Sequence, residues 1–128
     1  MSVLTTNQKG AIAETALAKA ALEVGYDVYR PMFEGGRYDL IFDTGEKMLR
    51  VQCKWAPDHD GVINVRSYSS RRAADGFRRT VYSEDEIDAI VAYCPENQRC
   101  YYVPAAKVTG RFGFNCALRR RETIKPTG

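Results

Sequence analysis

Apolar and polar positions alternate with a helical period at the start of the chain. Residues 5–25 open with Thr5-Thr6-Asn7-Gln8, which has the form of a capping box, with Thr at the cap and Gln three residues later. Apolar residues then recur at helical spacing: Ile12, Ala13, Ala16, Leu17, Ala20, Ala21 and Val24. Gly25 suits the C-terminal stop because glycine adopts positive φ at little cost. The pattern predicts an amphipathic helix that packs on a sheet.

Short runs rich in aromatic and β-branched residues follow, a composition typical of strands. We expect strands over residues 27–32, 38–42, 48–56, 62–68, 87–93 and 99–103. Turn chemistry separates several of them, as in Glu34-Gly35-Gly36, Asp43-Thr44-Gly45 and Pro95-Glu96-Asn97. Residues 69–86 are polar and arginine-rich and their pattern is ambiguous, and the region from Lys107 onward has no assignable pattern. The order predicts an α/β or α+β sandwich.

Length and composition indicate one compact domain spanning residues 1–128. The chain has 128 residues, 45% of them hydrophobic, which is enough for one core and too few for two comfortable domains. Charged residues make up 27% and both signs are interspersed. We therefore expect the chain to fold without a partner.

Cysteine usage indicates a reduced, cytoplasmic protein that is not attached to a membrane. The four cysteines show no CxxC spacing, and no signal peptide or long apolar run is visible. The single histidine, His59, lies in a polar turn, so a structural zinc site would lack ligands.

Basic residues are clustered, although the net charge of only +3 says little by itself. Two arginine-rich stretches flank the acidic residues 84–88. A solvated face is the ordinary interpretation of either stretch. Three aromatic residues interleave the first stretch, namely Tyr68, Phe77 and Tyr82. Rings among arginines slightly favour a surface that binds nucleic acid.

Asp39 is an acid within the expected strand 38–42, where its neighbours are apolar. Burying a lone carboxylate costs several kcal/mol, a large share of the roughly 5–15 kcal/mol that stabilise a domain. A metal ion or a cationic side chain would offset this cost. Asp39 is therefore the first candidate site residue.

The expected strand 48–56 carries the second part of the candidate site. Its alternation places Arg50, Gln52 and Lys54 on one face. If this strand pairs with strand 38–42 through the turn at Thr44-Gly45, an acid, an amide oxygen and an ammonium converge at one sheet edge. That combination suits phosphodiester hydrolysis.

Glu14 lies beside the apolar stripe of the helix, with no lysine or arginine at its i±3 or i±4 positions. A carboxylate there can extend over the sheet toward Asp39. A glutamate alone is more often a solvated helix residue, and a Gln-x-Lys pair alone is common. The joint order, a capped helix with Glu, a strand with Asp, a turn and a strand with Gln-x-Lys, favours a site.

This order resembles the PD-(D/E)xK nuclease superfamily across about residues 7–103. The stretches Asn7-Gln8-Lys9-Gly10 through Glu14, Arg37-Tyr38-Asp39-Leu40 and Val51-Gln52-Cys53-Lys54 look most like endonucleases associated with group I introns, which are also similar to archaeal Holliday-junction resolvases. The resemblance implies a restriction-endonuclease-like α/β core of order αβββαβ, in which an N-terminal helix packs on a central mixed sheet.

The resemblance also implies a metal-dependent DNA endonuclease, of the homing type that cuts double strands. Glu14, Asp39 and Gln52 are the implied metal ligands, and Lys54 is the implied lysine of the motif. The expected ion is Mg²⁺, with Mn²⁺ as an alternative, because hard cations prefer oxygen ligands. Two departures are the missing Pro before Asp39 and the neutral Gln52 in place of an acid.

DNA and a second copy of the chain are the expected partners, and no small-molecule cofactor is expected. Phosphate contacts are assigned first to Arg66, Arg71, Arg72, Arg78 and Arg79 and then to Arg119, Arg120 and Arg121. A domain this small would cover a duplex site as a homodimer or homotetramer.

Three other interpretations remain open at this point. A structure-selective enzyme, such as a Holliday-junction resolvase or a repair nuclease, would use the same residues on branched DNA. A catalytically inactive DNA-binding protein of nuclease fold would explain the neutral Gln52. A domain with unrelated surface charges would require the ordered motifs to be a coincidence.

Overall fold

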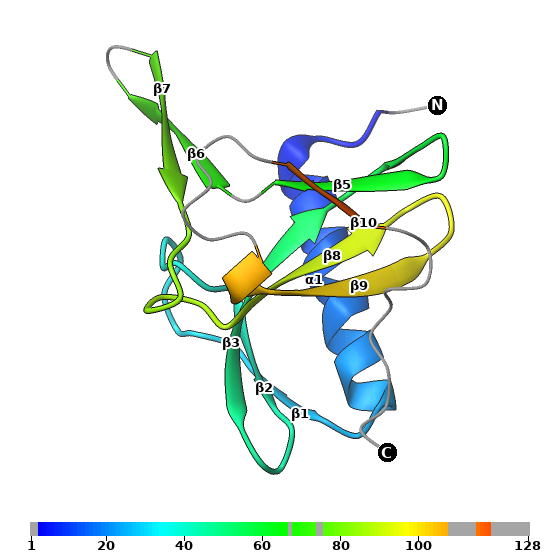
Figure 1. Cartoon of the computed structure of the whole chain (residues 1–128), viewed down its shortest axis with the longest axis vertical. Coiled ribbons are helices and arrows are strands. Elements are labelled where there is room, and N and C mark those ends of the chain that lie inside the picture. Colours follow the sequence, from blue (N-terminus) through cyan, green and yellow to red (C-terminus); the bar gives the residue numbers. More distant parts are fainter. Residues whose placement is uncertain (1–2, 67, 74–75, 108–114, 119–128) are drawn as a thin grey trace.

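The computed structural model describes residues 3–66, 68–73, 76–107 and 115–118 (Figure 1). Its centre is a five-stranded mixed sheet with the helix α1 (Thr6–Glu23) packed on one face. In spatial order the strands are β1 (Asp27–Tyr29), β2 (Leu40–Asp43), β3 (Met48–Trp55), β8 (Ala89–Cys94) and β9 (Arg99–Pro104). The expected restriction-endonuclease-like α/β class is confirmed.

Both ends of α1 are formed by the residues that the sequence indicated. Thr5 Oγ1 accepts a hydrogen bond from Gln8 N at 3.1 Å, and Thr5 N donates to Gln8 Oε1 at 2.8 Å, which completes the capping box. At the other end Gly25 has φ of 93°, and Tyr26 N donates to Ala21 O at 3.0 Å. This is a Schellman ending, which requires the left-handed conformation that glycine adopts readily.

The apolar stripe of α1 packs on the sheet through small and branched residues. Ala13, Leu17 and Ala21 are buried against a core that includes Phe42 and Val91. Alanines on the contact face let the helix lie close to the strands. Ile12 differs from the expected stripe because 39% of it is exposed, which places it at the outer margin of the apolar face.

The pairing of β2 with β3 follows the expected turn and sets the register of the site. The strands are antiparallel, with Leu40 opposite Val51. β3 then pairs in parallel with β8, where Gln52 lies opposite Ile90, and β8 forms an antiparallel pair with β9. The expected hairpin over residues 87–103 is therefore confirmed.

A second core lies on the face of the sheet opposite α1. It combines Ile90 and Val103 of the central sheet with Ile63 and Val65 of β5. β5 belongs to a small sheet in which β10 (Asn115–Leu118), β5 (Val62–Arg66) and β4 (Asp58–His59) are neighbours. The central sheet is thus covered on both faces, by a helix on one and by strands on the other.

The connection from β3 to β8 differs from the expected αβββαβ order. In the described part of residues 56–88 there are strands and turns, and no second α-helix. Besides β4 and β5, this connection contains a hairpin of β6 (Tyr68–Ala73) and β7 (Gly76–Val81). Residues 105–107, after β9, form a short 3-10 helix, η1 (Ala105–Lys107). The alternating branched residues of β5 favour strand over helix and explain part of this difference.

The first expected strand is shorter than the sequence suggested. β1 ends at Tyr29, and residues 30–39 connect it to β2, with residues 30–37 as a loop. Pro31 lies two residues after Tyr29 and has no N–H for a ladder bond, which is consistent with the early end of the strand. The loop lies beside Glu14 and Asp39, two residues of the site described below. No helix in the described part of the chain is long and apolar enough to cross a membrane.

Candidate active site

Asp39 is held at the start of β2 by two hydrogen bonds to β3. Its backbone N donates to Val51 O at 2.8 Å, and Cys53 N donates to its carboxylate Oδ2 at 2.9 Å. The first bond continues the strand pairing by one residue, and the second fixes the direction of the side chain. The register therefore places Asp39 beside Gln52 at the end of the β2 and β3 pair.

Burial dominates the electrostatics of Asp39. Loss of water raises the pKa of this carboxyl, whereas the Cys53 N–H and the charges of Lys54 and Arg30 act in the opposite direction. The net shift is upward, so the local cations and the hydrogen bond do not fully compensate for desolvation. An additional cation near Asp39 would stabilise its charged form.

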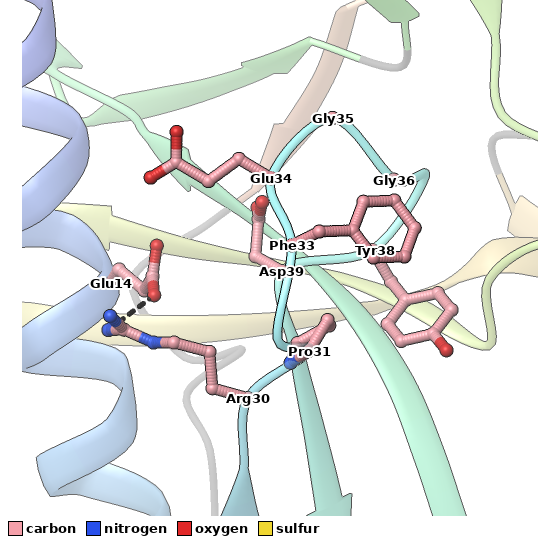
Figure 2. A pocket seen from close by; sticks show the side chains of 9 residues that line it. All are labelled: Glu14, Arg30, Pro31, Phe33, Glu34, Gly35, Gly36, Tyr38 and Asp39. Carbon is pink, nitrogen blue, oxygen red and sulfur yellow. Dashed lines mark ion pairs between the residues drawn. The ribbon is translucent and has the colours of Figure 1, made fainter.

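Glu14 reaches the same region from α1. Its Oε1 lies 2.6 Å from Arg30 Nη2, an ion pair visible in Figure 2. Partial burial raises the pKa of Glu14, the Arg30 charge lowers it, and the charges of Asp39 and Glu34 raise it. The expected lack of a partner along the helix is correct, but the loop after β1 supplies one.

A hollow of about 270 Å³ lies between α1 and the loop of residues 30–37. Figure 2 shows the carboxylates of Glu14, Glu34 and Asp39 gathered around it. The rest of its lining comes from Arg30, Pro31, Phe33, Gly35, Gly36 and Tyr38. Gly35 has φ of 97°, a conformation that allows this loop to turn tightly beside the acids. The hollow is rich in oxygen ligands and carries one arginine.

Lys54 approaches Asp39 from β3. Cys53 and Trp55 pack in the core beneath α1, so the alternation of the strand places Gln52 and Lys54 on the opposite face. The Lys54 charge is close enough to lower the pKa of Asp39, and its Nζ donates to Tyr82 Oη at 2.9 Å. Among the described residues, neither Gln52 nor Lys54 lines the hollow that contains Glu14.

The structure thus brings the four predicted residues around one end of the β2 and β3 pair. Glu14 and Asp39 share the hollow, Lys54 interacts electrostatically with Asp39, and Gln52 lies beside Asp39 in the strand register. Within the described part of the chain, no group of three or more His, Cys, Asp or Glu side chains is arranged to hold a metal ion. Gln52, which offers an amide oxygen, is not one of these four residue types.

The predicted DNA-contacting arginines are placed only in part. Arg66 lies in β5, Arg71 and Arg72 in β6, and Arg78 and Arg79 in β7, with Arg71 opposite Arg78 in the hairpin. Their backbones are described and their side chains are not. The second set, Arg119, Arg120 and Arg121, lies outside the described residues.

Tyr82 does not belong to the surface that its neighbours in the sequence suggested. Only 1% of it is exposed, and its ring belongs to the core opposite α1. Its hydroxyl instead contacts Lys54. Proximity to arginines in sequence was a misleading signal here, because Tyr82 follows the end of β7 and re-enters the core.

Several site residues had no signal in the sequence. Arg30 and Glu34 are ordinary charged residues of a loop with no motif spacing, and Arg37 belongs to the stretch Arg37-Tyr38-Asp39-Leu40 but has no role of its own in the sequence-based prediction. Their roles arise because the loop after β1 folds back against α1 and against the chain after β7. The Gly35-Gly36 turn marked the loop but not its direction.

A helix on a mixed sheet, with an acid on one strand and Gln-x-Lys on its antiparallel neighbour, defines the restriction-endonuclease-like class of nucleases. The family model described as PD-(D/E)XK endonuclease matches residues 4–126, so the chain belongs to that family and is an endonuclease. DNA is the substrate that this nuclease fold implies.

A solved structure supports the same assignment. The structure of a bacterial homing endonuclease, I-Ssp6803I, is similar to this chain with a TM-score of 0.76 and 27% identity. The match covers 97% of this chain and 86% of that one. A search of curated proteins finds no match.

Proposed function

We propose that this endonuclease is a metal-dependent enzyme of the homing type that cuts double-stranded DNA. The observation that carries the proposal is the meeting of Glu14, Asp39 and Lys54 at one end of the β2 and β3 pair. The similarity to a bacterial homing endonuclease over nearly the whole chain supports the type of enzyme.

The ligand types at this position fit a hard divalent cation. Asp39 and Glu14 offer carboxylate oxygens, and Gln52 offers an amide oxygen, which are ligands that Mg²⁺ and Mn²⁺ accept. Burial raises the pKa of both carboxyls, and the Asp39 charge adds to the rise at Glu14, so a cation there relieves an existing cost. Burial also raises the pKa of the neighbouring Cys53 thiol, which therefore stays protonated and is a poor ligand.

Asp39 and Gln52 are the proposed primary ligands, with Glu14 as a third. When bound, a divalent cation polarises the scissile phosphate and lowers the pKa of a coordinated water. The Asp39 carboxylate is already oriented by the Cys53 N–H, so it needs little rearrangement to bind. Glu14 must exchange its ion pair with Arg30 to contribute an oxygen.

Lys54 is the proposed electrostatic catalyst. Its ammonium is a compact positive charge that stabilises negative charge as it builds on the phosphate in the transition state. A cation that is preorganised near the reacting group is more effective than a mobile one because it pays no reorganisation cost during reaction. Lys54 Nζ donates a hydrogen bond to Tyr82 Oη, a contact that supports this role.

The β6 and β7 hairpin is the proposed DNA-binding element. Its register places Arg71 opposite Arg78 and Ser70 opposite Arg79, which concentrates basic residues on a two-stranded ribbon. The major groove of B-DNA is wide enough to admit such a ribbon. Arg66 in β5 and the C-terminal Arg119, Arg120 and Arg121 are additional proposed phosphate contacts.

Assembly into a homodimer or homotetramer completes the proposal. One chain of 128 residues offers one set of site residues, whereas a double-strand cut needs two cleavage events. Two-fold symmetry would place two sites on the two strands of a duplex. Analytical ultracentrifugation with and without DNA measures this directly.

A plasmid library with random inserts tests the function and finds the target sequence in the same experiment. The purified protein is incubated with the library and Mg²⁺, Mn²⁺ or EDTA, and cut ends are sequenced. We expect metal-dependent cuts that share a sequence and disappear in Lys54→Ala and Asp39→Ala variants. Cutting of a four-way junction in preference to every linear sequence would instead indicate a structure-selective enzyme. Metal-independent cutting would contradict the proposed site.

A further inference from the structure

Tyr82 is a deeply buried polar side chain next to the proposed catalytic residues. It follows β7, is 1% exposed and packs in the core with Ile63, Ile87 and Ile90. Tyrosines buried this far usually direct their hydroxyl at a polar partner. Here the Tyr82 oxygen accepts a hydrogen bond from Lys54 Nζ at 2.9 Å.

The ring of Tyr82 also contacts two cations. Lys54 Nζ lies 4.9 Å from the ring centroid, and the Arg37 guanidinium carbon lies 4.4 Å from it. Both distances are in the range where the negative face of a ring attracts a cation. Arg37 is in turn fixed by Glu86, whose Oε2 accepts from Arg37 Nε at 2.8 Å. The loop that carries Arg37 and the strand that carries Lys54 therefore both contact the phenol of Tyr82, although the three residues are far apart in sequence.

We propose that Tyr82 is a positioning residue that holds the Lys54 ammonium for the cleavage reaction. The lysine stem carries about 2 kcal/mol of rotamer entropy, and an unrestrained ammonium would spend much of its time away from the phosphate. A buried phenol attached to a packed core supplies a fixed acceptor. An ammonium has three N–H donors, so a bond to Tyr82 is compatible with a bond to a phosphate oxygen.

The hydrogen bond to Tyr82 also disfavours a direct ion pair between Lys54 and Asp39. The charges of these two residues already interact, since Lys54 lowers the pKa of Asp39. Removal of the phenol oxygen takes away one contact that opposes the attraction of the ammonium to that carboxylate. Such a pair would occupy a proposed metal ligand and withdraw the lysine from the phosphate. This role rests on the proposed function of Lys54 and Asp39.

The Tyr82→Phe variant isolates the hydroxyl because it retains the ring, its packing and its attraction for both cations. Tyr101→Phe is the matched control. Tyr101 is 0% exposed, belongs to the same core, and its hydroxyl accepts a hydrogen bond from Asn97 Nδ2 at 2.9 Å. Each variant loses a buried hydroxyl that accepts a hydrogen bond, from Lys54 Nζ in one case and from Asn97 Nδ2 in the other.

Steady-state cleavage of a DNA that the unmodified protein cuts, measured over a range of DNA concentrations, gives the first readout. We expect Tyr82→Phe to lower kcat about 10- to 100-fold, the effect of a small misplacement of a catalytic group, with KM for DNA unchanged. Tyr101→Phe should cut at the normal rate. Urea unfolding of both variants, which are expected to lose similar stability, separates this effect from a general weakening of the fold.

Side-chain NMR of ¹⁵N-lysine-labelled protein gives a second readout that needs no DNA. A held ammonium exchanges its protons slowly, so we expect an observable Lys54 signal, assigned by its loss in Lys54→Arg. The signal should broaden or vanish in Tyr82→Phe and persist in Tyr101→Phe. Its persistence in Tyr82→Phe would overturn the proposal, as would a normal kcat in that variant.

Lys54→Ala distinguishes failure of this inference from failure of the proposed function. If Lys54→Ala is inactive and Tyr82→Phe cuts normally, Lys54 acts without the phenol and only the positioning role is wrong. If Lys54→Ala itself cuts normally, the proposed site is wrong and the role of Tyr82 is overturned with it.

Discussion

Arg30 Nη2 lies 2.6 Å from Glu14 Oε1 and thereby places a guanidinium at the mouth of the hollow that also contains Asp39. The pair links the loop after β1 to α1, the two elements that form the walls of the hollow (Figure 2). Arg30 is 69% exposed, whereas Glu14 is 25% exposed. The arginine can therefore move into solvent or toward a phosphate more easily than the carboxylate can move.

The first prediction concerns competition between Arg30 and a divalent cation. Arg30→Gln removes a positive charge that pairs with Glu14 and repels a cation bound at Asp39. Because Arg30 is largely exposed, its effect is limited to about 1 kcal/mol, which corresponds to roughly fivefold tighter Mn²⁺ binding. Isothermal titration calorimetry without DNA measures the change.

Lys19→Gln is the control for this titration. It also removes one positive charge from a glutamate ion pair, with Glu23 at 3.4 Å, on the exposed surface of α1. We expect Lys19→Gln to bind Mn²⁺ like the unmodified protein. Equal affinities for Arg30→Gln and the unmodified protein would show that Arg30 and the cation do not compete.

The second prediction concerns the acid limb of cleavage. The pKa values of Asp39 and Glu14 are both raised, so both carboxyls take up protons at a higher pH than ordinary carboxyls, which titrate near pH 4. Protons and the cation compete for the same oxygens. Cleavage should therefore fall with decreasing pH, and more Mg²⁺ should shift the midpoint to lower pH. A midpoint independent of Mg²⁺ concentration would contradict ligation by these residues.

The third prediction separates stability from activity at Asp39. Folding raises the pKa of Asp39, so its contribution to stability is largest below the unfolded pKa and is lost as pH rises through the folded pKa. At neutral pH the charged form is thus destabilising. Asp39→Asn should raise the free energy of unfolding by about 1 kcal/mol while abolishing cleavage. Urea unfolding at pH 7 checks the first part, and the plasmid assay checks the second.

Asp88→Asn is the opposing control. Hydrogen bonds and the charge of Arg50 lower the pKa of Asp88, since Arg50 N and Nε donate to its Oδ2 at 2.8 and 3.1 Å. Its contribution is present above the unfolded pKa and is lost as pH falls through the folded pKa. Asp88→Asn should therefore destabilise the protein at pH 7, by about 0.5 to 1 kcal/mol, because solvent screens this partly exposed pair. The same Asp-to-Asn substitution would then raise the free energy of unfolding at position 39 and lower it at position 88.

The sequence carried enough information for the central fold because its strongest signals are local. The capping box at Thr5, the stop at Gly25 and the turn at Gly45 act within a few residues, and each is found in the structure. The alternation in β3 likewise fixed the common face of Gln52 and Lys54. These signals, together with the family resemblance, place the residues of the proposed site on α1, on β3 and directly before β2.

The remaining features depend on contacts between segments far apart in sequence. The pairing of Arg30 with Glu14 requires knowing that the loop after β1 folds back on α1. The position of Tyr82 near arginines in the sequence slightly favours a basic surface, but the chain after β7 returns it to the core beside Lys54. The strand-rich connection between β3 and β8 replaced an expected helix for a similar reason, because β5 packs on the central sheet. Local patterns do not encode such tertiary choices.

The fourth prediction tests whether Gln52, the neutral residue among the proposed ligands, binds the cation. Gln52→Glu adds a third carboxylate beside Asp39 and should tighten Mn²⁺ binding, because it increases the negative charge of the ligand set. Gln52→Leu has a similar size and removes the oxygen, so it should weaken binding and cleavage. Calorimetry on both variants provides the comparison. If both variants bind Mn²⁺ like the unmodified protein, Gln52 is not a ligand.

The fifth prediction concerns the salt dependence of DNA binding by the β6 and β7 hairpin. Each phosphate contact that a basic residue makes adds about 0.9 to the slope of log affinity against log salt concentration. Replacing Arg71 and Arg72 by Gln should therefore weaken binding to any duplex and lower that slope by nearly two. Fluorescence anisotropy with EDTA, at several salt concentrations, measures affinity without cleavage. Arg99→Gln, an exposed residue at the start of β9, is the control for loss of charge alone. An unchanged slope in the double variant would remove the hairpin arginines from the interface and leave Arg66 and the C-terminal arginines as the remaining proposed contacts.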